Sequence, residues 1–210
     1  MNGKMMILGL APWALFAILT ERMGASAVGI AALLACVSSL ALAFVGRSKS
    51  VARGNGGIKI IDAAGIVTFG IIAVLGFLGN SGLNDALADF GRGGATFVLA
   101  AVMAVSVVTV PFTEQYARDS VDPQYWGTPR FHEKNKSISA MWAGVVFAMA
   151  VCHVIAGALA SSTEMTNNHP GNLLLNWVVP IALIVWAVKR TGRIAGDHSA
   201  TPNSATPQAT

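Results

Sequence analysis

Charged residues are scarce in this chain of 210 residues: they make up 11% of it, whereas a typical soluble domain contains about 25%. Hydrophobic residues make up 54%, and the mean hydropathy is +0.60. This composition excludes an ordinary soluble domain and, with its long apolar runs, predicts an all-α membrane protein. The basic residues occur in short clusters between those runs and not along one polar element, which excludes a nucleic-acid-binding surface.

Cysteines and catalytic motifs are also scarce. The two cysteines, Cys36 and Cys152, both fall inside apolar runs. They are interpreted as small packing residues, and a disulfide framework is excluded. The sequence contains no H-E-x-x-H, no G-x-S-x-G, no phosphate-binding glycine loop and no paired carboxylates. We therefore expect no enzymatic activity, no cofactor and no metal site.

Five apolar runs approach or exceed the length of about 20 residues that a helix needs to cross the hydrocarbon core of a bilayer. They lie at 25–45, 59–79, 94–112, 138–161 and 172–188. A sixth run, 5–20, is shorter and contains Pro12. We expect it to form a tight hairpin with the next span, which gives a bundle of about six membrane segments. A cleaved signal peptide over 1–27 is the alternative for this first segment.

Lysine and arginine are distributed unevenly between alternate connections. Arg22 and Arg92 are the only two on one side, and the other twelve lie before residue 5, at 46–59, at 113–137 and after 188. By the positive-inside rule the second set is cytoplasmic, so both termini face the cytoplasm, which is consistent with an even number of crossings. Residues 1–193 then form one transmembrane domain. The tail from 194 to 210 is small and polar, and we expect it to be disordered.

Small residues recur at every fourth position in two of the spans. One set is Ala27, Ala31, Ala35, Ser39 and Ala43, and the other is Ala140, Gly144, Ala148, Cys152, Ala156 and Ala160. Each set predicts a smooth helix face that a neighbouring backbone can approach closely. The general abundance of alanine is an equally good explanation. If the faces are real, Gly144→Leu should destabilise the fold or block a partner helix.

Two polar residues inside the spans are candidates for function. Asp62 is the only carboxylate within the apolar runs, and it follows Lys59 at the start of its helix. A capping role at the helix N-terminus is favoured over ion coupling. His153 lies several turns inside its span and could relay protons or bind metal. A hydrogen bond between helices is favoured, because no second histidine lies in a span.

The longest polar stretch, residues 111–137, holds both tyrosines of the chain. Its aromatic side chains alternate with basic ones, as in a segment that lies at the level of lipid head groups. An anchor for the two spans that it joins is favoured over a ligand-binding loop. Asn135 or Ser137 is expected to cap the following helix. The candidate functional residues of this cytoplasmic stretch are Gln115, Tyr116, Arg118, Trp126 and Asn135.

A resemblance to a known family covers most of the chain outside the tail. The residues that carry it are Leu10-Ala11-Pro12, the basic loop before Lys59, then Pro111, Gln115, Pro123, Trp126, Asn135, Trp142 and Phe147. In this order and spacing the chain resembles the intracellular septation protein A family of small bacterial inner-membrane proteins. The high alanine and glycine content departs from that family and leaves an uncharacterised sister family as the alternative. The resemblance implies a non-enzymatic role in envelope maintenance and cell division.

Three hypotheses about function follow. The first is a membrane protein that acts through contacts with lipids or with division or wall-synthesis proteins, alone or as a homo-oligomer. The second is a small-solute or ion transporter or channel. The polar residues that would line its path are His153, Asp62, Asn172, Asn176, Ser106 and Thr109. An enzyme acting on lipid substrates is the third.

Overall fold

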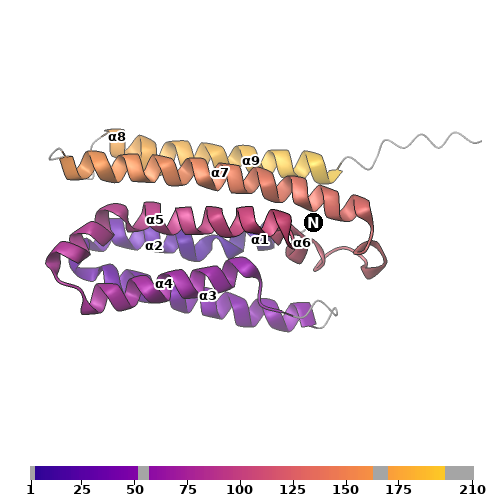
Figure 1. The fold of residues 1–210 in the computed structure, drawn as a ribbon, viewed down its shortest axis with the longest axis horizontal. Coiled ribbons are helices and arrows are strands. Elements are labelled where there is room, and N and C mark those ends of the chain that lie inside the picture. The colour runs from indigo at the N-terminus through magenta and orange to yellow at the C-terminus, as the bar shows by residue number, and fades with distance from the viewer. Residues whose placement is uncertain (1–2, 52–56, 163–169, 197–210) are drawn as a thin grey trace, which may run out of the picture.

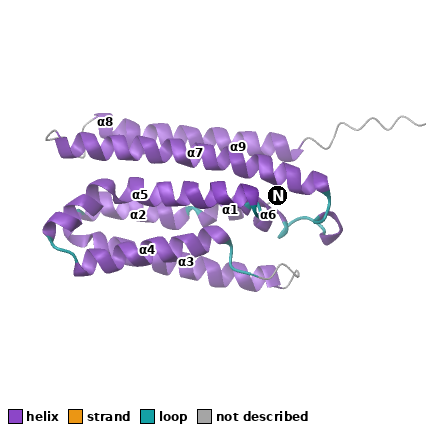
Figure 2. Ribbon diagram, in the orientation of Figure 1, coloured by secondary structure: helices purple, strands orange, loops and turns teal. Residues whose placement is uncertain are grey.

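The computed structural model describes residues 3–51, 57–162 and 170–196, and within them all regular structure is helical (Figures 1 and 2). The long helices are α3 (Val28–Val51), α4 (Ile60–Leu78), α5 (Ser81–Val108), α7 (Pro129–Ser162) and α9 (Val179–Gly196). The short elements are α1 (Gly3–Gly9), α2 (Ala11–Met23), η1 (Ala25–Ala27), α6 (Phe112–Ala117), η2 (Pro123–Tyr125), α8 (Pro170–Leu173) and a π-helical turn, η3 (Leu174–Val178). The predicted all-α class is confirmed for this part of the chain.

Five helical segments of the described chain are long and apolar enough to cross a membrane. They are Ala25–Ser48, Ile60–Leu78, Ser81–Val108, Pro129–Ala160 and Gly171–Gly196. Each contains or overlaps one of the five long apolar runs of the sequence. Large apolar side chains such as Phe44, Leu78 and Val108 are exposed on the outside of these helices. An exterior of this kind is typical of a surface that lipid covers.

The first apolar segment does not form one continuous helix. It is divided at Leu10 into α1, of 7 residues, and α2, of 13 residues. Pro12 lies in the first turn of α2, where its missing N–H is not needed. Neither helix alone reaches the length of about 20 residues that a crossing requires.

The helices run along the long axis of the molecule (Figure 1). α7 and α9 lie on one side, α3 and α4 on the opposite side, and α2 and α5 between them. The most extensive packing is between α5 and α7 and between α3 and α4. We refer to the two ends of the bundle as the α6 end, which also holds α1, and the α8 end, which also holds the turns between α2 and α3 and between α4 and α5.

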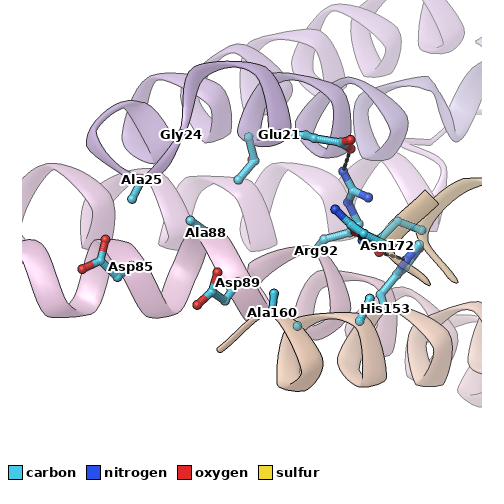
Figure 3. A pocket seen from close by; sticks show the side chains of 14 residues that line it. Glu21, Gly24, Ala25, Asp85, Ala88, Asp89, Arg92, His153, Ala160 and Asn172 are labelled. Carbon is cyan, nitrogen blue, oxygen red and sulfur yellow. Dashed lines mark hydrogen bonds and ion pairs between the residues drawn. The ribbon is translucent and has the colours of Figure 1, made fainter. Parts of the chain in front are cut away.

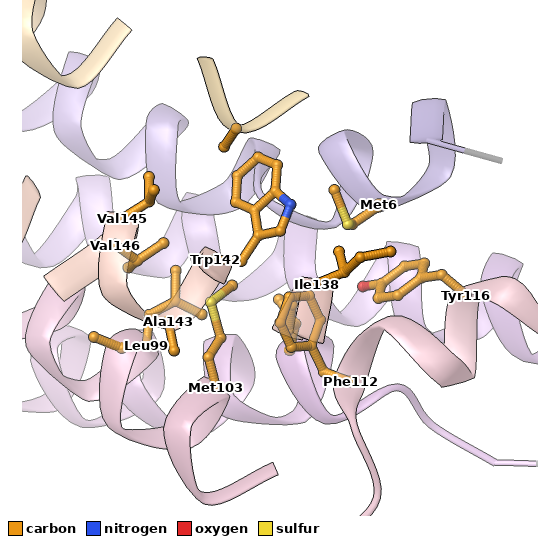
Figure 4. Packing of buried hydrophobic residues seen from close by; sticks show 13 residues of the cluster. Met6, Leu99, Met103, Phe112, Tyr116, Ile138, Trp142, Ala143, Val145 and Val146 are labelled. Carbon is orange, nitrogen blue, oxygen red and sulfur yellow. The ribbon is translucent and has the colours of Figure 1, made fainter. Parts of the chain in front are cut away.

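Two groups of buried side chains hold the bundle together. The larger group joins α1, α4, α5, α6, α7 and α9 and includes Trp142, Phe112 and Tyr116 (Figure 4). Trp142 is fully buried, and its Nε1 donates a hydrogen bond to Thr191 Oγ1 of α9 at 2.9 Å. The smaller group joins α2, α3, α4 and α5.

The small residues of α3 form the predicted packing face. Ala31, Ala35, Ser39 and Ala43 are all buried. Packing is so close that a Cβ atom placed on Gly76 of α4 would lie 2.7 Å from the Cα atom of Gly29. The expectation of close backbone approach is confirmed for this helix.

The small residues of α7 do not behave in the same way. Ala140 and Gly144 are exposed, and a Cβ atom on Gly144 would meet nothing within 4 Å. The expectation that Gly144→Leu disturbs packing within the chain is therefore wrong. The face of α7 that packs into the bundle is a different one, and it carries bulky buried residues such as Trp142 and Val146. Close approach to α5 occurs instead at Gly157, where an added Cβ atom would lie 2.5 Å from the carbonyl oxygen of Asp89.

Two helices begin earlier than the apolar runs indicate. α5 begins at Ser81, after Asn80, whose side chain accepts a hydrogen bond from the Leu83 N–H at 2.9 Å. α7 begins at Pro129, after Thr128, whose hydroxyl accepts from the Phe131 N–H at 3.3 Å. The expectations that 80–93 is a connection and that the 113–137 loop lasts to residue 137 are wrong. Both helices begin with polar turns, which lie outside the apolar runs.

Two further boundaries differ from the sequence expectations. Asn135 and Ser137 lie inside α7, so neither caps it. α9 continues to Gly196, so the first three residues of the expected tail are helical. The remainder of that tail, 197–210, lies outside the described residues.

Candidate functional site

Two adjoining cavities lie between α2, α5, α7 and the segment from α8 to α9. The polar cavity has a volume of about 360 Å³ and lies toward the α8 end (Figure 3). The apolar cavity has a volume of about 330 Å³ and extends toward the α6 end. Arg92, His153 and Asn176 line both, so they form the boundary between a polar and an apolar compartment.

Arg92 of α5 is the best-anchored charged residue of this boundary. Its Nη2 donates to the Ala17 carbonyl oxygen at 2.6 Å and to Glu21 Oε2 at 2.8 Å. Its guanidinium lies over the Trp177 ring at 5.1 Å, and Trp177 Nε1 also donates to Glu21 Oε2 at 2.8 Å. Arg92 Nη1 is buried and has no hydrogen-bond partner among the described residues. Because a guanidinium offers five N–H donors, Arg92 can bind an additional acceptor.

His153 is held by a chain of amides on the opposite wall. Its Nδ1 lies 2.9 Å from Asn176 Oδ1, and Asn176 Nδ2 donates to Asn172 Oδ1. The Asn176 oxygen is therefore the acceptor, and His153 Nδ1 carries the hydrogen. This is the hydrogen bond between helices that the sequence favours. Among the described residues, no group of three or more histidine, cysteine or carboxylate side chains is placed to hold a metal ion.

A π-helical turn positions the polar residues that lie before α9. Pro180 has no N–H, and its ring crowds the carbonyl of the residue four positions earlier, Asn176. The turn η3 accommodates this proline by widening the helix between residues 174 and 178. Asn176 and Trp177 both belong to the widened turn and both face the cavities. π-Helical turns occur frequently at functional sites.

The apolar cavity reaches the outer surface of the bundle. Its lining includes Ile7, Ala14 and Ile181, which are exposed on α1, α2 and α9. Deeper in, Leu99 and Trp142 close the cavity with buried apolar side chains. The opening therefore lies on the apolar side of the protein and not on a polar end.

The polar cavity has an acidic mouth. Asp85 and Asp89 of α5 are exposed there and lie away from Arg92 (Figure 3). They are four residues apart and therefore share one face of the helix. Neither forms a hydrogen bond or an ion pair with the described residues. Three carboxylates, including Glu21, and one guanidinium line this cavity, so its lining is negative overall.

A second polar cluster lies at the α6 end, around Lys59. The Lys59 ammonium forms an ion pair with Asp119, and the Ser50 hydroxyl donates to the other Asp119 oxygen at 2.8 Å. Lys59 also lies over the Tyr116 ring at 4.4 Å. The Ile60 N–H, at the start of α4, donates to Gln115 Oε1 at 2.9 Å. The cluster thus ties the beginning of α4 to α6 and the turn after it.

Asp62 lies beside this cluster but does not cap its helix by a hydrogen bond. It is buried, and its Oδ1 has no partner among the described residues. The free N–H of Ile60 is satisfied by Gln115, so the predicted capping role belongs to Gln115 and not to Asp62. The Tyr116 hydroxyl is buried and also lacks a partner in the described chain. Burial, and then the carboxylates of Asp62 and Asp119, raise the pKa of the Tyr116 phenol, so it stays protonated.

The other candidates of the 111–137 stretch make contacts within the chain. Arg118 donates to Glu114 at 2.5 Å and lies over the Trp126 ring at 5.5 Å. Asn135 is buried, and its Nδ2 donates to the Phe131 carbonyl oxygen at 2.8 Å. The stretch is therefore an anchor between α6, α4 and α7. Tyr116, expected at head-group level, is instead part of the core.

Sequence reasoning missed the charged part of the cavity site. Arg92 falls in an expected connection, and the sequence analysis singles out neither Glu21 nor Asp85 and Asp89. The expectation that the sequence has no paired carboxylates is wrong, because Asp85 and Asp89 lie on one face of α5 at the same cavity. The signal that could have found them is Asn80, a favourable N-cap residue, because a helix that starts there carries Arg92 into the bundle. Of the predicted site residues, the structure brings His153, Asn172 and Asn176 together and places Asp62 in the separate cluster at the α6 end.

The fold and the site together define a class: within its described residues the protein is all-helical, with five helical segments that can span a membrane and two adjoining cavities, one polar and one apolar. Comparisons with models of protein families, with curated proteins and with solved structures found no match to this chain. The resemblance to the septation protein A family therefore stays a prediction.

Proposed function

We propose that this chain is a multi-pass protein of the bacterial inner membrane that binds one amphiphilic lipid in its two cavities and acts in the envelope through that contact, without catalysis. The observation that carries the proposal is the change from a polar to an apolar lining across Arg92, His153 and Asn176. A lipid has the same division, because its head group needs polar partners and its chain needs an apolar wall.

The opening of the apolar cavity supports entry from the bilayer. Ile7 and Ile181 lie at its edge, on helix surfaces that lipid tails would cover. A lipid that enters sideways between α1, α2 and α9 keeps its hydrocarbon chain out of water throughout. Its head group then reaches Arg92 Nη1, a buried donor that an anionic oxygen would satisfy.

The distribution of basic residues supports an orientation. The α6 end carries Arg118, Arg130, Lys134 and Lys136, so the positive-inside rule places it in the cytoplasm. The polar cavity would then face the outer side of the membrane. With α1 and α2 together as a sixth, short crossing, both termini lie on the cytoplasmic side.

The family resemblance supports the biological setting of the proposal. The order of residues from Pro111 to Phe147 is its most specific part. It points to envelope maintenance and cell division, with division or wall-synthesis proteins, or a second copy of the chain, as partners. A lipid-binding protein fits this setting, because division remodels the membrane in which such a protein lies.

Replacing Ala14 with phenylalanine tests the lipid proposal. Ala14 lines the apolar cavity, so a phenyl ring there would occupy the volume meant for the hydrocarbon chain. We expect lipid binding to weaken about tenfold or more, which corresponds to a loss of about 1.4 kcal/mol or more. Native mass spectrometry of the full chain in mild detergent, titrated with bacterial lipid extract, measures this change.

Ala104→Phe is the matched control for this experiment. Ala104 is exposed on α5 and lines neither cavity, so the same substitution adds the same ring to the outer surface. Lipid binding should stay at the level of the unmodified protein. Equal lipid binding by all three proteins would contradict the proposal.

A transporter or channel is the second candidate, and the chain of side chains His153, Asn176 and Asn172 is the observation that favours it. The other residues of the expected path do not extend this chain. Ser106 and Thr109 donate to backbone carbonyl oxygens of their own helix. Solute or proton flux in liposomes that His153→Ala abolishes would support transport over lipid binding.

A further inference from the structure

We propose that the head group bound in the polar cavity is zwitterionic, with its phosphate at Arg92 and a protonated primary amine at Asp85 and Asp89, as in phosphatidylethanolamine. This inference rests on the proposed lipid binding and adds the chemical class of the ligand. It is carried by the placement of one cation and two carboxylates at successive depths of the same cavity (Figure 3).

Arg92 supplies the inner half of the site. Its Nη2 is engaged by Ala17 and Glu21, whereas Nη1 is buried without a partner in the described chain. A buried donor of this kind is unfavourable unless an acceptor satisfies it. A phosphate oxygen is such an acceptor, and its hydrogen bonds to a guanidinium are charge-assisted and strong.

The charges around Arg92 disfavour a head group that is only anionic. Glu21 lies 2.8 Å from Arg92 and already neutralises much of its charge. Asp85 and Asp89 then make the cavity lining negative overall. A lipid such as phosphatidylglycerol would meet this negative field with no positive group to offset it.

Asp85 and Asp89 supply the outer half of the site. They precede Arg92 by seven and three residues on α5, which is about 10 Å and about 4.5 Å along the helix axis at a rise of 1.5 Å per residue. The two-carbon link between phosphate and amine in phosphoethanolamine matches only the shorter of these separations, so Asp89 is placed to accept from the amine and Asp85 adds negative charge farther out in the same cavity (Figure 3). A primary ammonium donates three hydrogen bonds, which carboxylates accept, whereas a choline head group has no N–H to donate.

The test compares lipids that differ only in the head group. The full chain in mild detergent is titrated with phosphatidylethanolamine, phosphatidylcholine and phosphatidylglycerol of identical chains, and bound lipid is counted by native mass spectrometry. We expect phosphatidylethanolamine to bind about tenfold more tightly than the other two, a difference of about 1.4 kcal/mol. Glycerophosphoethanolamine, which has the head group without the chains, should compete weakly.

The double variant Asp85→Asn/Asp89→Asn should lower the affinity for phosphatidylethanolamine to that for phosphatidylcholine. Both positions are exposed, so folding should not change, and an unaltered melting curve checks this. Glu133→Gln removes an exposed carboxylate at the other end of the bundle and should leave the preference intact. Equal binding of the three lipids, or a preference that survives the double variant, overturns the head-group inference. If the lipids still bind and Ala14→Phe still weakens their binding, the proposed function stands. If Ala14→Phe leaves lipid binding unchanged, the proposed function and the head-group inference both fail.

Discussion

Replacing Lys59 with methionine should lower the free energy of unfolding by about 3–5 kcal/mol, because it leaves the partly buried Asp119 carboxylate and the buried Asp62 carboxylate without their neutralising cation. The Lys59 side chain is 7% exposed and that of Asp119 is 16% exposed, so water screens their ion pair weakly. Asp62 lies close enough to Lys59 for an electrostatic interaction as well. One ammonium therefore stabilises two carboxylates, and methionine preserves its volume but not its charge.

The effect should appear as a lower midpoint of thermal unfolding of the full chain in detergent. Lys136→Met is the control, since Lys136 is exposed on α7 and its charge is surrounded by water. The double variant Lys59→Met/Asp119→Leu should recover part of the loss, because replacing both members of a buried pair with apolar residues is often neutral. A midpoint for Lys59→Met equal to that for Lys136→Met would show that the ion pair contributes little.

The sequence predicts the long helices well because their apolar runs are a local property. The run at 59–79 differs from α4 by one residue at each end. The starts of α5 and α7 are predicted less well, because the first turns of both helices are polar and their limits depend on caps at Asn80 and Thr128. Apolar composition marks where a helix can meet lipid, whereas a cap marks where its hydrogen bonds begin.

The cavity site is harder to predict because its charges come from distant parts of the chain. Glu21 and Arg92 are 71 residues apart and meet only when α2 packs on α5. His153 could be singled out, because a histidine deep in an apolar run is conspicuous. Its partner Asn176 follows only from the register between α7 and η3, which sequence spacing does not determine.

The 111–137 stretch shows how the same composition fits two different structures. Alternating aromatic and basic residues are typical of a segment at lipid head groups. In the structure Tyr125 is exposed, as that interpretation requires, but Tyr116 is 2% exposed and packs beside Phe112. The difference arises because α6 turns one face toward α7 and the core, and only the folded chain shows which residues that face carries.

Gly76→Leu should destabilise the bundle by about 1–3 kcal/mol or more, the usual range for adding bulk to a tightly packed interface. A Cβ atom on Gly76 would lie 2.7 Å from both the Cα and the N atoms of Gly29, and backbone atoms cannot move aside as a flexible side chain can. The substitution should therefore force α3 and α4 apart. Thermal unfolding in detergent measures the loss.

Gly144→Leu is the matched comparison, because it makes the same change in a span where a Cβ atom would meet nothing within 4 Å. In an isolated chain it should be neutral or slightly stabilising, since glycine is less favourable than other residues inside a helix by about 0.5–1 kcal/mol. A loss of stability equal to that of Gly76→Leu would mean that another helix covers Gly144. The chain's own described helices do not cover Gly144, so that helix would belong to a second copy of the chain or to a partner protein. The mass of the detergent-solubilised particle before and after the substitution would distinguish these two cases.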